Sequence, residues 1–254
     1  MTGDDRDFDA FYYRNCCGGG DGYKRDRSWL AFFGTVADRI VADIGPRRVL
    51  DAGCGLGMLV ETLRARGVDA EGIDVSSFAI GQAHPSAAPF CRQGSIVEDL
   101  GGQYDLIVSV EVLEHLAPAD GERAIANLCA HTSDILFSST PFDLKELTHV
   151  NVQRPEAWVE QFARHGFFRD VDFDAGFINP WAIRFRKRAE PVHRIVREYE
   201  RRFAMLEIER NEVRKRALEL QRELAERQAP LSRKAYLAAR RMGGRLLRLL
   251  GVMK

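Results

Sequence analysis

Hydrophobic and polar positions follow two alternating periods along roughly the first three quarters of the chain. Short apolar runs of strand length are separated by longer stretches in which apolar residues recur every three or four positions, as on one face of a helix. The short runs predict strands near residues 47–51, 70–75, 89–93, 104–110, 134–140, 169–174 and 182–187. The longer stretches predict helices near residues 28–44, 57–67, 118–130 and 155–165. This alternation implies an α/β fold in which helices cover both faces of a mostly parallel sheet.

A glycine-rich turn joins the first predicted strand to its helix. Its sequence is DAGCGLG, residues 51–57, and its three glycines let the backbone approach a ligand with no Cβ atom in the way. The next strand ends in Asp74, where a carboxylate can accept both hydroxyl hydrogens of a ribose. Because ligands of parallel sheets bind beyond the carboxyl ends of the strands, the turn and Asp74 predict a nucleoside-cofactor site.

Details of the turn discriminate between cofactors. A dinucleotide fingerprint, Gly-x-Gly-x-x-Gly, would require glycine at position 58, where the chain has Met58. Asp51 would also repel a pyrophosphate, whereas a carboxylate there suits a ligand that carries an ammonium and a sulfonium group. These two features favour S-adenosylmethionine as the cofactor.

The pattern Asp51-x-Gly53-x-Gly55-x-Gly57, with Asp74 one β-α-β unit later, resembles the first two motifs of the class I S-adenosylmethionine-dependent methyltransferases. Three later stretches agree with the strand order of that family. They are YDLIVSVEV at 104–112 for its fourth strand, DILFSST at 134–140 for its fifth, and residues 182–187 for its closing antiparallel strand.

The resemblance implies a Rossmann-like, seven-stranded, mostly parallel sheet within residues 31–188. It also implies cofactor contacts, because in the family the positions of Ser95 and Ile96 border the adenine and the region of Glu111 lies near the methionine end. The implied cofactor-binding residues are Asp51, Gly53, Gly55, Gly57, Asp74, Ser95, Ile96 and Glu111.

His149 is the candidate catalytic residue. Methyl transfer requires the acceptor to be aligned with the sulfonium carbon, and a hydroxyl acceptor also benefits from a base within hydrogen-bond reach. His149 follows the fifth strand after a short loop, so it can face the methyl group. The alternative is a histidine that caps the loop or orients the substrate.

The sequence Glu111-x-x-Glu114-His115 has two interpretations. On a helix after the fourth strand the three side chains could converge on a divalent cation, and the pattern resembles a metal-binding pattern of the ubiquinone-pathway O-methyltransferases. The same residues can instead open a helix with acidic side chains that the helix dipole favours. We predict that they hold no metal.

The segment before the core, residues 1–30, is rich in aromatic residues and glycine and is predicted to be a lid. Its rings could wall the acceptor pocket, or they could simply pack on the core. The rings in question belong to Tyr12, Tyr13, Tyr23 and Trp29.

A further resemblance concerns the acceptor. Residues 149–158 and 162–167 look like methyltransferases found alongside glycosyltransferases in bacterial surface-polysaccharide systems, which implies O-methylation of a sugar hydroxyl on a surface glycan or glycolipid. One alternative is a small-molecule O- or N-methyltransferase of the quinone or natural-product type. Another is a non-catalytic scaffold that recruits glycosyltransferases to the membrane. The complete set of cofactor residues favours catalysis.

The chain after residue 188 has two parts. In residues 189–228, apolar residues fall on alternating three- and four-residue steps with Arg210 at the one polar position, which predicts a coiled coil. The apolar residues are Phe203, Leu206, Val213, Ala217, Leu220 and Leu224. Such a helix would form a homo-oligomer or bind a glycosyltransferase, unless it is solitary and docks on the core. Residues 229–254 carry seven basic and no acidic residues beside an apolar helical face, as in a helix at an anionic bilayer or in a partner's acidic groove.

Charge and cysteine usage narrow the class of protein. The formal net charge is zero, but residues 1–188 carry 20 basic against 28 acidic residues, which argues against a nucleic-acid partner. The five cysteines form neither a disulfide framework nor a zinc spacing, and the amino terminus does not read as a signal peptide. We therefore expect a cytoplasmic protein that contacts the inner face of the membrane through its basic tail.

Overall fold

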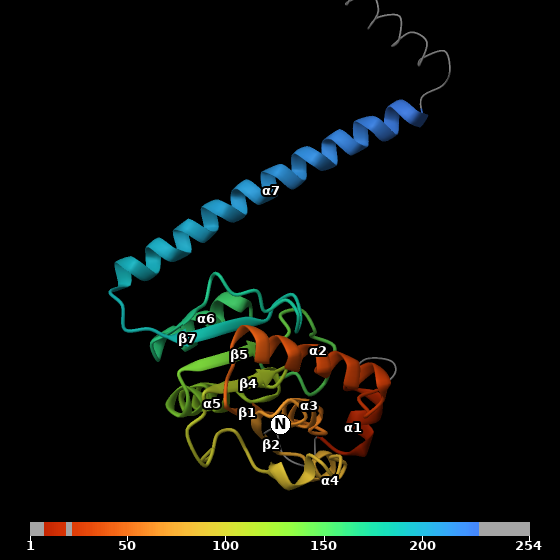
Figure 1. Ribbon diagram of the computed structural model, residues 1–254, viewed down its shortest axis with the longest axis vertical. Coiled ribbons are helices and arrows are strands. Elements are labelled where there is room, and N and C mark those ends of the chain that lie inside the picture. The colour runs from red at the N-terminus through yellow and green to blue at the C-terminus, as the bar shows by residue number, and fades with distance from the viewer. Residues whose placement is uncertain (1–7, 19–21, 229–254) are drawn as a thin grey trace, which may run out of the picture. The chain divides into compact units, whose positions relative to one another are not determined.

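The computed structural model describes residues 8–18 and 22–228 of the chain. Within them it confirms the predicted fold, because seven strands form a mostly parallel, Rossmann-like sheet in the order β3-β2-β1-β4-β5-β7-β6 (Figure 1). The strands are β1 (Arg48–Ala52), β2 (Asp69–Asp74), β3 (Cys91–Gln93), β4 (Leu106–Val110), β5 (Asp134–Ser138), β6 (Phe167–Arg169) and β7 (Ile183–Lys187). The pairs among β1 to β5 are parallel, whereas β7 runs antiparallel to both β5 and β6.

Helices cover both faces of this sheet. Successive strand residues point to opposite faces and are apolar on both, so both faces must be covered. Val49 packs in a core cluster with residues of α2 and α3, whereas its neighbour Leu50 packs in a cluster with residues of α5 and α6. The helices described within residues 8–18 and 22–190 are α1 (Ala10–Asn15), α2 (Arg27–Asp43), α3 (Met58–Arg64), α4 (Ser77–Gly81), α5 (Pro118–His131) and α6 (Pro155–Arg164), with short 3₁₀ turns η3 (Ala88–Phe90) and η4 (Leu113–His115).

The prediction of the sixth strand at 169–174 was wrong in its position. The chain leaves α6 through Gly166, which has a φ of 79°, and the fully buried Phe167 already pairs with Lys187 of β7. After Arg169 the side chain of Asp170 accepts the N–H of Asp172 at 3.4 Å in a turn. The observed strand β6 therefore ends at Arg169, the residue at which the predicted strand begins.

The chain divides into two units, Met1–Ile195 and Val196–Lys254. The helix α7 (Val192–Gln228) occupies the segment for which a long helix was predicted. The predicted domain boundaries at residues 30, 188 and 228 stay predictions. The predicted basic tail, 229–254, lies outside the described residues. Among the helices that the structure describes, none combines the length and apolar character needed to cross a membrane.

Candidate active site

The glycine-rich turn lies between the end of β1 and the start of α3. Gly53 and Gly57 have φ values of 90° and 70°, in the left-handed region that glycine adopts without strain. A Cβ atom on Gly53 would lie 2.3 Å from Val112 Cγ2, and one on Gly57 would lie 2.8 Å from Cys91 Sγ. Both the backbone conformation and the lack of space therefore require glycine here.

Asp74 ties the end of β2 to this turn. Its Oδ2 atom accepts the backbone N–H of Gly55 at 2.8 Å, and its Oδ1 atom accepts that of Ser76 at 2.8 Å. The side chain is buried, and its two oxygens are oriented by these bonds. Each carboxylate oxygen has a second lone pair, so the group can also accept the hydroxyl hydrogens of a ribose.

Asp51, at the end of the neighbouring strand β1, is a buried carboxyl group in the same region. Burial, with a further contribution from the charge of Asp74, raises the pKa of Asp51 to about 8. The carboxyl groups of Asp51 and Asp74 lie in a poorly solvated site, where they repel each other when both are ionised. A ligand that brings a positive charge would relieve this repulsion.

The two carboxyl groups line a cavity of about 350 Å³ at the carboxyl ends of the strands. This volume is within the ordinary range for small-molecule sites. Of the predicted cofactor residues, the ones that line it are Asp51, Gly53, Gly55, Asp74, Ser95, Ile96 and Glu111. Gly57 is not among the lining residues, because it caps the amino end of α3.

Aromatic residues before α3 form a wall of this cavity. Asp9 caps α1 by accepting the N–H groups of Phe11 and Tyr12, and Ser76 Oγ donates to the carbonyl oxygen of Phe8 at 2.6 Å. These bonds hold α1 near the carboxyl end of β2. The aromatic residues that line the cavity are Phe8, Tyr12, Tyr13, Tyr23, Trp29, Phe32 and Phe33. The predicted lid residues thus do border the cavity.

Glu111 has a constrained backbone and side chain. It follows β4 with a φ of 56°, the one positive φ outside glycine among the described residues. Its Oε1 atom accepts hydrogen bonds from Ser138 Oγ at 2.7 Å, Trp181 Nε1 at 2.9 Å and Asn179 Nδ2 at 3.1 Å. Sequence reasoning missed Asn179 and Trp181, which come from the loop before β7 and lie far from Glu111 in sequence.

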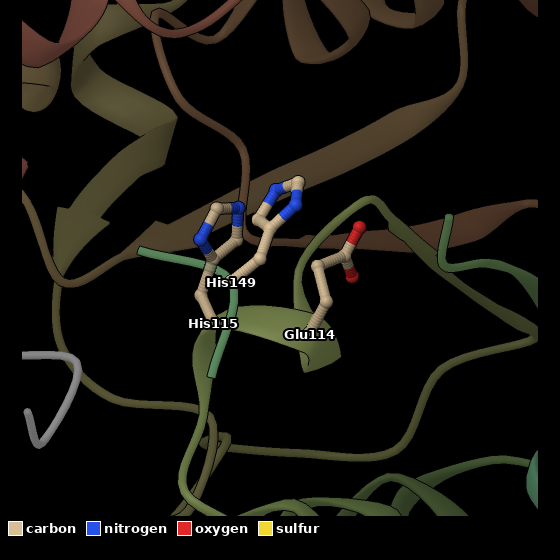
Figure 2. Close-up of side chains that lie close together, drawn as sticks. All are labelled: Glu114, His115 and His149. Carbon is tan, nitrogen blue, oxygen red and sulfur yellow. The ribbon is translucent and has the colours of Figure 1, made fainter. Parts of the chain in front are cut away.

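Beside this residue lies a cluster of Glu114, His115 and His149, in which one potential ligand atom of each lies within 4.8 Å of the others (Figure 2). Figure 2 shows the two imidazole rings next to each other. Their centroids lie 4.6 Å apart. His115 lines the cavity, and its Nε2 atom lies 3.4 Å from the hydroxyl of Tyr12. His149 is not among the lining residues, and its Nδ1 atom lies 2.9 Å from the carbonyl oxygen of Asp143.

Burial shifts the pKa of two members of the cluster in opposite directions. The pKa of His115 falls to about 4, because burial and the nearby His149 disfavour its charged form. The pKa of the fully buried Glu114 carboxyl rises, because burial and the charge of Glu111 disfavour ionisation. His115 is therefore a neutral imidazole near pH 7.

The cluster differs from the predicted metal set. The Oε1 atom of Glu111 already accepts three hydrogen bonds, and His149 stands beside Glu114 and His115 instead. Two imidazoles and one carboxylate are ligands that suit a transition-metal ion such as Zn²⁺. These three residues could therefore hold an ion, although the sequence prediction was that no metal is needed.

Comparison with known proteins decides the family. A family model described as a methyltransferase domain matches residues 23–168, which is more than half of the chain. The chain belongs to this family. It therefore contains an S-adenosylmethionine-dependent methyltransferase domain, and the match covers the glycine-rich turn, Asp74, Glu111 and the cluster.

Curated relatives of this methyltransferase domain include O-methyltransferases. The chain is 34% identical over 113 residues to the ubiquinone biosynthesis O-methyltransferase of Aromatoleum aromaticum, which is 39% of this chain and 46% of that protein. It is 35% identical over 107 residues to the protein of the same name in Chromobacterium violaceum, again 39% and 46%. The chain thus spans about half the length of the curated relatives that it matches.

Solved structures of methyltransferases share the fold. CalS10, an amino pentose methyltransferase from Micromonospora echinaspora involved in calicheamicin biosynthesis, has a TM-score of 0.53 and 18% identity over 65% of this chain and 93% of its own. The mitomycin 7-O-methyltransferase MmcR has a TM-score of 0.50 and 16% identity over 63% of this chain and 54% of its own. These likenesses establish the architecture of the methyltransferase domain.

Proposed function

We propose that the protein transfers the methyl group of S-adenosylmethionine to a hydroxyl group of a small, largely apolar molecule. The observation that carries this proposal is the composition of the cavity, whose lining combines the glycine-rich turn and two carboxyl groups with seven aromatic side chains. The polar part of this lining suits a charged nucleoside cofactor, and the aromatic part suits a flat apolar acceptor.

On the cofactor side, we assign the ribose hydroxyls to Asp74 and the positively charged methionine end to the region of Asp51 and Glu111. Support for the first assignment is that the backbone N–H groups of Gly55 and Ser76 already hold the Asp74 carboxylate in one orientation. Support for the second is the raised pKa of Asp51, since a neighbouring ammonium group would favour its ionised form. Ser95 and Ile96 would border the adenine.

On the acceptor side, we assign the proton of the hydroxyl to the histidine pair. S-adenosylmethionine supplies an activated methyl group, whose transfer makes an O–CH₃ bond as the S–CH₃ bond breaks, and the hydroxyl proton must leave. His115 lines the cavity as a neutral imidazole and can accept that proton. His149, the base predicted from the sequence, packs against His115 and would orient it.

The names of the relatives favour a small-molecule acceptor over the glycan predicted from residues 149–167. Both are O-methyltransferases of ubiquinone biosynthesis, and they match the chain over 39% of its length. The glycan acceptor, the glycosyltransferase partner and the scaffold role stay predictions from the sequence.

The test is transfer of labelled methyl from S-adenosylmethionine to two sets of acceptors, hydroxylated aromatic or quinol compounds and lipid-linked glycans. The proposal expects labelled ether products in the first set and none in the second. Labelling of the glycans alone would restore the prediction made from the sequence. A chain that binds the cofactor but labels neither set would favour the scaffold role.

A further inference from the structure

The part of α7 in the second unit, from Val196 onward, carries a continuous heptad seam. If Val196 is taken as an a position, the a positions are Val196, Phe203, Arg210, Ala217 and Leu224, and the d positions are Tyr199, Leu206, Val213, Leu220 and Arg227. Large seam side chains are exposed, including Phe203 at 59% and Val213 at 70%. A 3.5-residue repeat of apolar side chains sustained over this length is the pattern by which helices pair.

We propose that this seam binds the same seam of a second copy of the chain, with the two helices antiparallel. The partner is identified by the charges that flank the seam. The g positions are Arg202, Glu209, Arg216 and Glu223, and the e positions are Glu200, Glu207, Arg214 and Gln221. The charges alternate in sign along the g positions, and the e positions change from acidic to basic along the helix. The flanks can therefore be complementary to themselves, as expected for a surface that pairs with its own copy.

The orientation follows first from the seam residues. In an in-register parallel pair each a residue faces its own copy, which would set Arg210 against Arg210 and Ala217 against Ala217. The antiparallel pair centred between Asn211 and Glu212 instead sets Phe203 against Leu220. It also sets Ala217 against Leu206 and Arg210 against Val213. The small side chain then faces a large one, and the two like charges are separated.

The flanking charges are all favourable in this antiparallel register. There g positions face g positions and e positions face e positions. The facing pairs of opposite charge are Arg202 with Glu223, Glu209 with Arg216, and Glu207 with Arg214, whereas Glu200 faces the uncharged Gln221. Each pair occurs twice in the dimer, so six ion pairs would flank the seam. Arg210, one of the two arginines in the seam, also forms an ion pair on its own helix, where its Nη2 atom lies 2.6 Å from Glu207 Oε2.

The helix provides a matched control for the seam itself. Leu206 is a d residue, 47% exposed, whereas Ile208 lies on the opposite face and is 60% exposed. In the full chain, sedimentation equilibrium is expected to give twice the chain mass for the wild type. Leu206→Asp is expected to weaken association by about 100-fold or more, because a charge would be buried in the seam. Ile208→Asp is expected to leave association unchanged, with both variants retaining their helical circular dichroism.

A charge exchange tests the orientation. Glu209→Arg sets like charges against each other twice and is expected to weaken the dimer by about tenfold. Adding Arg216→Glu restores both pairs in the antiparallel dimer and is expected to restore the affinity. Adding Arg214→Glu restores pairs only in a parallel dimer, in which position 209 faces position 214, and is expected not to rescue.

Three outcomes would overturn the proposal. A wild-type monomer at concentrations up to about 100 μM would show that the seam docks within its own chain or on another partner. Rescue by Arg214→Glu rather than Arg216→Glu would make the pair parallel. A dimer that survives Leu206→Asp would place the interface elsewhere. None of these outcomes depends on the acceptor or on methyl transfer.

Discussion

The backbone N–H of Gly55 donates to Oδ2 of Asp74 across 2.8 Å, which joins the glycine-rich turn after β1 to the end of β2. In our proposal the Asp74 side chain has two functions. It fixes the turn along which the cofactor would lie, and it would accept the hydrogens of the ribose hydroxyls. Substitutions of Asp74 that differ in charge can separate the two functions.

We expect Asp74→Ala to weaken S-adenosylmethionine binding by about 1.5–3 kcal/mol, because charge-assisted hydrogen bonds to the ribose are lost. Asp74→Asn keeps an oxygen that can accept the N–H of Gly55 but loses the charge, so its affinity should fall between those of the wild type and the alanine variant. Isothermal titration calorimetry measures both. Unchanged affinity in the alanine variant would remove Asp74 from the site.

Asp51 should make the stability of the ligand-free protein depend on pH. Its pKa is about 8 in the folded protein and about 3.9 when unfolded, so between these values the folded state holds a proton that the unfolded state has released. Its contribution to stability is therefore fully present below about pH 4 and is lost as the pH rises to 8.

Asp51→Asn should remove this dependence. We expect the variant to exceed the wild type by about 1–3 kcal/mol in unfolding free energy at pH 8, with the difference vanishing near pH 4. The same variant should bind S-adenosylmethionine more weakly. Urea unfolding at several pH values is the measurement, and parallel pH profiles for the two proteins would contradict the assignment.

The two histidines should differ in their kinetic effects. We expect His115→Ala to lower kcat by about 10²–10⁴-fold with nearly unchanged cofactor affinity, and His149→Ala to lower it by about tenfold. Since a base must be neutral, wild-type activity should be lost only as the pH falls through the pKa of His115, about 4. A larger loss of kcat in the His149 variant than in the His115 variant would make His149 the base.

Chelation tests the role of the cluster formed by Glu114, His115 and His149. We expect methyl transfer to persist in excess chelator, because the proposed transfer of the hydroxyl proton to the neutral imidazole of His115 requires no metal ion. Loss of activity on chelation, with recovery on adding one divalent metal, would assign the cluster as a required metal site. A Glu114→Gln variant that no longer responds to that metal would confirm it.

The fold and the cofactor side of the site could be predicted because their signals are local. The strand–turn–helix of residues 47–67 requires glycines in left-handed conformations, and Asp74 comes at the end of the next strand, so sequence spacing alone brings them together. The local sequence did not predict the bounds of β6, because the turn at Gly166 and the pairing with β7 fix where that strand lies.

The surroundings of Glu111 and His115 could not be predicted in the same way, because their contacts are distant in sequence. Trp181 Nε1 donates to the carboxylate of Glu111, 70 positions earlier in the chain. The hydroxyl of Tyr12 lies 3.4 Å from Nε2 of His115, 103 positions later. The sequence offered His115 only as a metal ligand, since nothing in its spacing indicates that it lines the cavity. Tertiary packing alone reveals that role.

The proposed methyl transfer requires that the cavity beside Asp51 and Asp74 binds S-adenosylmethionine. The decisive measurement is calorimetric titration of the full chain with S-adenosylmethionine, and separately with NAD as a dinucleotide control. We expect saturable binding of S-adenosylmethionine at one molecule per chain and no measurable binding of NAD. Binding of NAD without binding of S-adenosylmethionine would contradict the assignment of the cavity.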